Sequence, residues 1–411
     1  MPVMLPVARR VLLTADPIGG VWTYAVELAR ALSGGLGGGA PMEVCVAVMG
    51  AALRPDQRRD LAGLPGVEVR ECRYRLEWMP DAWADVDAAG DWLLSLEREI
   101  APDVIHLNQF APGVLPWRAP RLVVAHSCVC SWWRAVHGVA APPEWDEYRL
   151  RLGAGLAGAD LVIAPTRAML AALEREHGPL AAAAAIPNAR AARTPPLARG
   201  ARAQKEELIL AVGRLWDEAK NVGMLAQLAP ELEWPVYLAG DTQHPSGRAA
   251  GSDGAERDGA APDRTGAGHA GSAARFLGRL DAPVLARWLR RAAIYALPAR
   301  YEPFGLSVLE AALAGCALVL GDIPSQRELW DGAALFVKPD DADTLRGVLR
   351  TLMVRGEMRR ALADAARRRA RSFTVERFAM AYRAAYARAA ARAYQRRGVP
   401  APRPAEVACA S

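Results

Sequence analysis

Apolar runs alternate with amphipathic stretches along the first half of the chain. The runs lie at residues 7–16, 42–50, 66–74, 102–109, 121–128 and 159–166. Amphipathic stretches between them, such as 21–32 and 91–100, predict helices. Strands that read as nearly continuous Val, Ile and Leu, and that alternate with helices, are typical of a parallel sheet covered on both faces.

The pattern breaks around residues 186–204, where Pro, Arg and small residues predict a linker, and then resumes. Apolar runs in the second half lie at 207–215, 234–241, 275–280, 293–299, 317–322 and 334–339. Residues 244–274 are rich in Gly, Ala and Asp and poor in bulky side chains, which predicts a disordered insertion. An Ala, Arg and Tyr stretch at 374–397 predicts a long terminal helix.

The fold class that follows is α/β, with two Rossmann-like doubly wound domains. We expect the first domain at 1–190, a linker at 191–204 and the second domain at 205–373, with a flexible tail at 398–411. Doubly wound sheets bind ligands at the carboxyl ends of their strands. Two such domains facing each other place the expected site in the cleft between them.

Composition narrows the class of protein. Of the 411 residues, 52% are hydrophobic and 23% charged, which excludes wholesale disorder. The net charge of +6 permits acidic partners without choosing among them. The apolar runs are shorter than the ~18 residues of a membrane helix, and the N-terminus does not resemble a signal peptide, so we expect a cytoplasmic protein. The six cysteines are scattered without a C-x-x-C pair, so neither a metal site nor a disulfide framework is expected.

The most informative segment is 300–322. Glu302 and Glu310 lie eight residues apart around a Pro-Phe-Gly turn that opens a helix. Glycine lets the backbone approach a ligand closely, and the N–H groups at a helix N-terminus attract anions. The amides of Phe304, Gly305 and Leu306 therefore form a candidate anion site with one carboxylate on each side.

Two cations accompany this segment. Arg214 directly follows an apolar strand, and Lys220 comes six residues later. Cations that converge at a strand end can neutralise the charge of a departing diphosphate. A basic pair in a solvated loop is the simpler alternative if the pair is considered alone.

Further candidates lie in the first half. Gly19 and Gly20 follow the first strand and fit either close approach to a phosphate or acceptor, or an ordinary tight turn. His126 and His106 each end a strand, and His106 is expected to be structural. Trp132, Trp133, His137 and Trp145 form an aromatic cluster past His126 that could contact sugar or lipid, although packing is the simpler interpretation.

Together these segments resemble the retaining, nucleotide-sugar-dependent glycosyltransferases of family 4, which have the GT-B fold. The resemblance rests on E-P-F-G-L-S-V-L-E at 302–310, the family's E-x7-E signature, on G-R-L at 213–215 with Lys220-Asn221, and on F-L-G-R-L at 276–280. It spans most of residues 11–372 and is densest in the second half. In this family the terminal helix, here 374–397, crosses back to the first domain.

The resemblance implies a role for each donor-side residue. Glu302 would contact the transferred sugar, the backbone at 304–306 would bind sugar hydroxyls and phosphate, and Glu310 would hydrogen-bond the ribose. Arg214 and Lys220 would hold the diphosphate, with the segment that ends at Leu280 near the base. His126 would reach the transferred sugar.

The expected activity is transfer of a sugar from a nucleotide-diphosphate donor, with retention, to an acceptor bound by the first domain. No cofactor or metal is expected, the donor being a co-substrate, and nucleic acid is not an expected partner. The acceptor could be a glycan, a lipid or a small metabolite. Arginines and tyrosines of 374–397 leave peripheral contact with the inner membrane face open. A nucleotide-sugar epimerase and a non-catalytic partner subunit remain alternatives.

Overall fold

The computed structural model describes residues 8–191, 205–243 and 273–398, which group into two compact units. The first unit comprises residues up to Ser131, Ala140–Ala189 and the segment from Thr374 on; the second comprises Trp132–Val139 and Arg190–Phe373. Most of the linker predicted at 191–204, of the insertion predicted at 244–274 and of the tail predicted at 398–411 lies outside the described residues.

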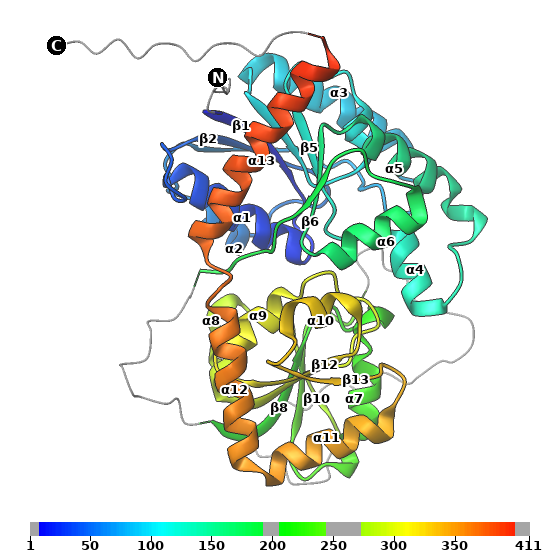
Figure 1. Ribbon diagram of the computed structural model, residues 1–411, viewed down its shortest axis with the longest axis vertical. Coiled ribbons are helices and arrows are strands. Elements are labelled where there is room, and N and C mark those ends of the chain that lie inside the picture. The colour runs from blue at the N-terminus through cyan, green and yellow to red at the C-terminus, as the bar shows by residue number, and fades with distance from the viewer. Residues whose placement is uncertain (1–7, 192–204, 244–272, 399–411) are drawn as a thin grey trace, which may run out of the picture. The chain divides into compact units, whose positions relative to one another are not determined.

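The first unit contains a parallel sheet of seven strands in the order β3-β2-β1-β4-β5-β6-β7 (Figure 1). The strands are β1 (Arg10–Ala15), β2 (Glu43–Val48), β3 (Val67–Glu71), β4 (Val104–Leu107), β5 (Arg121–Val124), β6 (Leu161–Ala164) and β7 (Ala183–Ala185). The helices are α1 (Gly20–Ser33), α2 (Pro55–Leu61), α3 (Trp83–Ile100), α5 (Asp146–Gly158), α6 (Arg167–His177) and α13 (Val375–Arg396). Helix α4 (Val129–His137) begins in the first unit, and its residues from Trp132 on belong to the second unit.

The second unit contains a parallel sheet of six strands in the order β10-β9-β8-β11-β12-β13. The strands are β8 (Glu206–Val212), β9 (Val236–Ala239), β10 (Arg275–Gly278), β11 (Ala292–Leu297), β12 (Ala317–Gly321) and β13 (Leu335–Val337). The helices are α7 (Val222–Leu228), α8 (Ala282–Arg291), α9 (Leu306–Leu313), α10 (Pro324–Trp330), α11 (Ala342–Val354) and α12 (Gly356–Ala370).

Both sheets reverse their strand order at one point, between β1 and β4 in the first unit and between β8 and β11 in the second. This is the order of a doubly wound sheet, in which the reversal opens a crevice at the strands' carboxyl ends. The central strands β4 and β11 are buried along their length, β1 is buried after its first residue, and β8 is buried from Leu208 to Ala211, as their apolar runs predict. The predicted fold class, two Rossmann-like domains, is confirmed.

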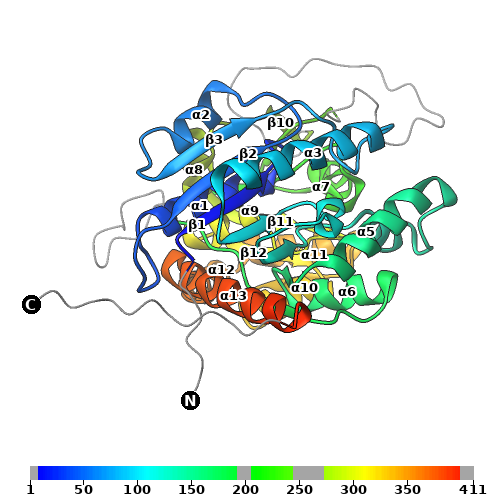
Figure 2. The same cartoon turned by 90° about the horizontal axis from the view of Figure 1, so that it is seen from above.

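The terminal helix α13 belongs to the first unit, as the crossing helix of the prediction does. It packs against α1, β5 and β6, and Figures 1 and 2 both show it against the first unit's sheet. Phe378, Tyr382 and Tyr386 on its inner face are buried. Among the described helices, none is both long and apolar enough to cross a membrane.

Candidate functional site

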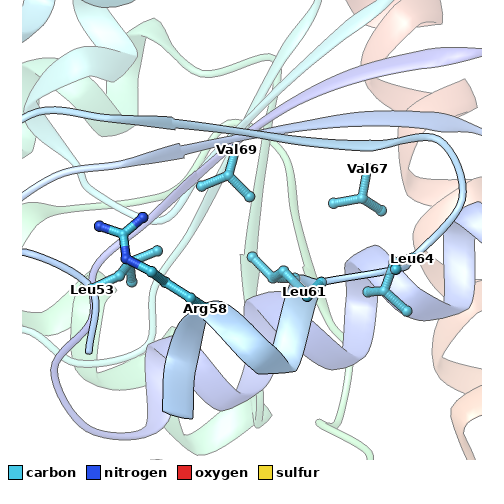
Figure 3. A pocket seen from close by; sticks show the side chains of 8 residues that line it. Leu53, Arg58, Leu61, Leu64, Val67 and Val69 are labelled. Carbon is cyan, nitrogen blue, oxygen red and sulfur yellow. The ribbon is translucent and has the colours of Figure 1, made fainter. Parts of the chain in front are cut away.

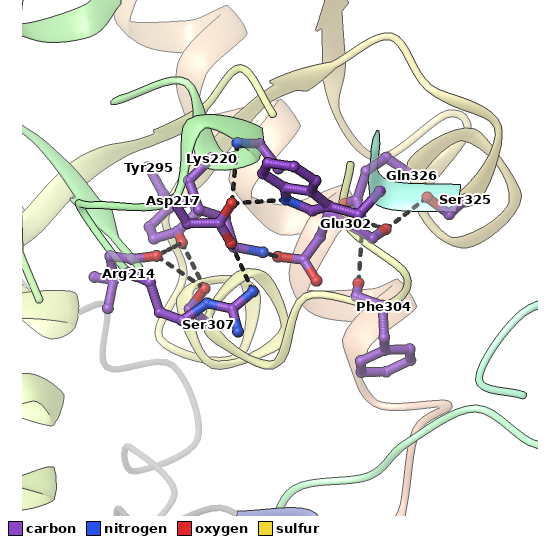
Figure 4. Close-up of polar contacts among 12 residues, drawn as sticks. Arg214, Asp217, Lys220, Tyr295, Glu302, Phe304, Ser307, Ser325 and Gln326 are labelled. Atoms are coloured by element: carbon purple, nitrogen blue, oxygen red, sulfur yellow. Dashed lines mark hydrogen bonds and ion pairs between the residues drawn. The ribbon is translucent and has the colours of Figure 1, made fainter. Parts of the chain in front are cut away.

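The strands on either side of the second sheet's reversal point carry the predicted donor residues. Arg214 lies two residues after β8, and Glu302 lies in the loop between β11 and α9. Because β8 and β11 pair directly in parallel, their carboxyl ends lie at the same edge of the sheet. Residues 88 positions apart in the sequence are therefore brought into one cluster (Figure 4).

Lys220 and Glu302 form an ion pair at the centre of this cluster. Lys220 Nζ lies 2.7 Å from Glu302 Oε2, and their side chains are only 11% and 12% exposed. Lys220 ends the short 3₁₀ helix η3 (Glu218–Lys220), and Asn221 turns the chain into α7 with a positive φ of 53°. The Asn221 amide fixes this turn by donating to the carbonyls of Pro298 and Pro339. The pair is thus held by two separate loops.

Asp217 joins the two predicted cations and was not among the predicted residues. Its carboxylate accepts from Arg214 Nη2 at 2.6 Å and from the backbone N–H of Ala219 at 3.0 Å. Burial disfavours the charged form, but the charges of Arg214 and Lys220 hold the pKa of Asp217 below its usual value. Its position three residues after one cation and three before the other was the available sequence signal.

The backbone around Glu302 is fixed by α10. Ser325 Oγ donates to the Glu302 carbonyl at 2.6 Å, and Gln326 Nε2 donates to the Phe304 carbonyl at 3.1 Å. Gln326 is 1% exposed, and the Phe304 ring packs edge-on against Phe373. Hydrogen bonds from α10 therefore hold the loop that carries the carboxylate in place.

Gly305 sets the start of α9. Its φ is +88°, and a Cβ there would lie 2.9 Å from Val308 Cγ2 and 3.3 Å from Glu302 Cγ. Only glycine adopts this conformation without strain. As the N-cap it brings no side chain, so the first N–H groups of α9 can meet a ligand. Ser307 is anchored by hydrogen bonds with Tyr295 OH and the Val212 carbonyl.

Glu310 lies within α9 and pairs with Arg190. Arg190 Nε is 2.5 Å from Glu310 Oε1, and the Arg190 side chain is 6% exposed. Glu310 itself is 20% exposed, so it remains accessible. Leu280, which follows β10, is half-buried against the second unit's core.

Charges alternate through the cluster, from Arg214 to Asp217 and from Lys220 to Glu302 (Figure 4). Each cation already has an acidic partner, so the side chains alone do not present excess positive charge. The amides at the N-terminus of α9 add the positive end of a helix dipole. The cations can bind an anion by exchanging their carboxylate partners for it. The carboxylates are then able to accept hydrogen bonds from hydroxyl groups.

The remaining predicted residues follow β1 and β5 at the carboxyl-end edge of the first sheet. Gly19 caps α1 with a φ of +66°, and Gly20 is the first residue of that helix. Asp16 accepts from the Ile18 N–H at 2.8 Å. The turn after β1 therefore needs glycine for its backbone conformation.

His126 follows β5 and is held by Asn108. Asn108 Nδ2 donates to the Thr14 carbonyl, which directs its Oδ1 toward His126 Nε2 at 2.8 Å. Nε2 must then carry the proton, which leaves Nδ1 as an acceptor. Burial lowers the pKa of His126 to about 3, so the ring is neutral at physiological pH. This histidine is suited to accept a hydrogen bond rather than to act as an acid.

His106 is fully buried and structural, as expected. Its ring nitrogens bond Tyr24 OH at 3.0 Å and Tyr386 OH at 2.9 Å, and burial lowers its pKa well below the usual value. On α13, Arg383 donates to backbone carbonyls of the α1–β2 segment. These α13 side chains are thus used inside the first unit.

The predicted aromatic cluster lies partly at the donor-side cluster. Trp132, Trp133 and His137 pack on one another along α4, with ring centroids 4.5–6.1 Å apart, and Trp132 Nε1 donates to Asp217 Oδ1 at 2.9 Å. Trp145 packs against Tyr148 instead. A small apolar hollow lies between α2 and β3 in the first unit, lined by Leu53, Leu61 and Val69 among others (Figure 3). It contains none of the predicted site residues.

The structure thus brings Arg214, Lys220, Glu302 and the α9 N-terminus together in the second unit. Glu310 lies on the same helix, and Leu280 follows β10, the edge strand of the same sheet. Gly19, Gly20 and His126 are grouped at the corresponding edge of the first sheet.

Two family models match the chain, one in each sheet region. "Glycosyltransferase Family 4" matches residues 18–190, and "Glycosyl transferases group 1" matches residues 206–354. A D-inositol 3-phosphate glycosyltransferase from Jonesia denitrificans is 33% identical over 116 residues, which is 28% of this chain and 27% of that protein. A glycogen synthase from Mycobacterium tuberculosis is 53% identical over 51 residues, 12% of each chain. The chain therefore matches about a quarter or less of these relatives' lengths.

Solved structures share the fold over nearly the whole chain. The sucrose-phosphate synthase of Thermosynechococcus elongatus has a TM-score of 0.70 at 18% identity, covering 92% of this chain and 98% of its own. HepE from Anabaena in complex with UDP-glucose has a TM-score of 0.65 at 16% identity, covering 91% and 98%. At these identities the similarity establishes the common architecture.

Proposed function

Starting from a glycosyltransferase of GT-B architecture, as the two domain matches and the fold indicate, we propose that the chain transfers a sugar from a nucleoside diphosphate donor to an acceptor hydroxyl. The observation that carries the proposal is the cluster at the β8–β11 reversal point. There Arg214, Lys220 and Glu302 meet the uncapped N-terminus of α9.

In this proposal the second unit binds the donor. The α9 amides and the two cations hold the diphosphate, with Lys220 exchanging its contact with Glu302 for a phosphate oxygen. Glu302 is then free to accept hydrogen bonds from the sugar. Glu310, with one oxygen held by Arg190, uses the other for the ribose hydroxyls, and the segment through Leu280 lies near the base.

The residues suit stabilisation of a leaving group. Cleavage of the bond between the sugar and the diphosphate leaves negative charge on the phosphate oxygen, and fixed cations and amides lower the energy of that charge. We further propose that configuration is retained, because this site favours an ion-paired, oxocarbenium-like state over a nucleophilic side chain. His126, with a neutral ring and a free Nδ1, accepts a hydrogen bond from a sugar hydroxyl, and the Gly19–Gly20 turn admits the acceptor or a phosphate.

UDP-glucose is the first donor to test, because HepE binds it on the same fold. Calorimetry with UDP, ADP and GDP would identify the base, and release of the nucleoside diphosphate from each sugar conjugate would measure turnover. The acceptor is then sought among glycans, lipids and small metabolites by the same release assay.

Variants connect the activity to the site. Arg214→Ala should reduce turnover about 100-fold to 1000-fold, the typical effect of removing one charge-stabilising group. Glu310→Gln should weaken nucleotide binding more than it slows turnover. Arg346→Ala is the matched control, because it removes a second-unit arginine that pairs with Glu231 away from the cluster.

Three results would contradict the proposal. Nucleotide binding that is absent for all three bases would indicate a non-catalytic partner subunit. Conversion of the donor sugar into its epimer without transfer would indicate an epimerase. If Arg214→Ala and Arg346→Ala turn over equally fast, the cluster does not take part in the reaction.

A further inference from the structure

Three possible metal ligands meet in the first unit, in a place that the donor site does not use. Cys128 precedes α4, Cys130 lies in its first turn, and His177 is the last residue of α6. Their ligand atoms all lie within 4.8 Å of one another. Cys128 and Cys130 are 1% and 0% exposed, while His177 is half-buried.

The spacing agrees with a tetrahedral thiolate and imidazole site. With Zn–S bonds of about 2.3 Å and Zn–N bonds of about 2.0–2.1 Å, adjacent sulfur and nitrogen ligands lie about 3.6 Å apart. Cys128 Sγ and His177 Nε2 are 3.5 Å apart. The remaining separations, within 4.8 Å, need only a small side-chain rotation to reach the corresponding edge of about 3.8 Å between two sulfurs.

We propose that Cys128, Cys130 and His177 bind a Zn²⁺ ion that fastens the start of α4 to the end of α6. Thiolates and imidazoles are the usual ligands of Zn²⁺ in proteins, and a water molecule would fill the fourth position. The half-buried His177 marks the side from which the ion enters. Metal binding at this site can be tested whether or not the proposed sugar transfer is correct.

The end of α6 is fixed next to the proposed ligands. Gly178, with a φ of +83°, ends α6 immediately after His177 and so fixes that residue's place.

The site would also set the geometry of a functional segment. Cys128 lies two residues after His126, and α4 continues into Trp132 and Trp133. An ion at Cys128 and Cys130 therefore restrains the chain on both sides of that turn. The expected role is to position His126 rather than to take part in the chemistry.

The sequence did not reveal this site because the ligands are poorly spaced for recognition. The two cysteines are separated by one residue rather than two, and His177 follows 47 residues after Cys130. The β6 strand and α6 bring the histidine back to α4.

The test uses the full-length protein purified under reducing conditions. Equilibrium dialysis against Zn²⁺ followed by elemental analysis should give one ion per chain in the wild type and in Cys72→Ser, which changes a cysteine of the same unit outside the cluster. Cys130→Ser and His177→Gln should lose that ion. Co²⁺ added to the metal-free wild type should give the visible bands of a tetrahedral site and a thiolate charge-transfer band.

The Co²⁺ spectrum is measured on the wild type, so it tests the metal site even if one of the variants fails to fold. A wild type without stoichiometric Zn²⁺, or retention of the ion by folded His177→Gln, would overturn the proposal. A Cys128–Cys130 disulfide found by peptide mapping of the freshly purified protein would also overturn it.

Discussion

The Lys220–Glu302 pair allows a quantitative test of how the cluster is held. Both side chains are nearly buried and their charged atoms are 2.7 Å apart. At that distance the attraction is about 6 kcal/mol for an effective dielectric constant of about 20, and much of it offsets the loss of hydration. We therefore expect Lys220→Met or Glu302→Gln alone to lower the free energy of unfolding by about 3–5 kcal/mol. The double variant should cost clearly less than the sum of the two.

Urea unfolding followed by circular dichroism measures all four members of this cycle. The matched control is Arg300 with Asp340, whose charged atoms are also 2.7 Å apart but whose side chains are 27% and 78% exposed. That pair should couple by about 1 kcal/mol or less. If the costs of Lys220→Met and Glu302→Gln simply add, within about 0.5 kcal/mol, the pair does not hold the cluster and the reasoning fails.

Three further predictions concern other parts of the molecule. Gly305→Ala should lower the free energy of unfolding by about 1–3 kcal/mol and weaken donor binding measured by calorimetry, because the positive φ and the 2.9 Å approach force strain, whereas Gly347→Ala in open space on α11 should be neutral or stabilising. Burial raises the pKa of Glu77 to about 7, so the stability that its protonated form contributes is present at low pH and is lost as the pH rises through 7. Urea unfolding should show this decline, and Glu77→Gln should flatten it. An unchanged pH profile would contradict the assignment. Tyr386→Phe leaves a buried nitrogen of His106 without its partner and should cost about 1–3 kcal/mol in thermal or urea unfolding; a cost near zero would mean that the hydrogen bond contributes nothing.

The sheet architecture was predictable because central parallel strands are buried on both faces and read as uninterrupted apolar runs. Both sheets were expected from these runs alone. Short elements with weak patterns were missed: β7 is three alanines, and α10 has only seven residues. Their place is decided by neighbouring strands and loops rather than by local preference.

The candidate site was predictable as far as its residues follow strands. Arg214 and Glu302 could be placed at one sheet edge from their positions in the sequence, and Gly305 from the turn it must form. The partners of these residues could not be foreseen, because Asp217, Arg190 and Gln326 acquire their roles only through tertiary contacts. The cysteine and histidine ligands of the proposed zinc site were hidden for the same reason.

The bonds of α13 to the first unit have a consequence for biosynthesis. His106 sits in the middle of the first sheet and gains one of its two partners only from Tyr386, 280 residues later. A nascent chain on the ribosome therefore cannot complete its first domain when that domain's strands emerge. The second unit can fold first, whereas the core of the first unit stays incomplete until α13 has left the ribosome. A chain truncated near residue 374 should accordingly stay bound to chaperones.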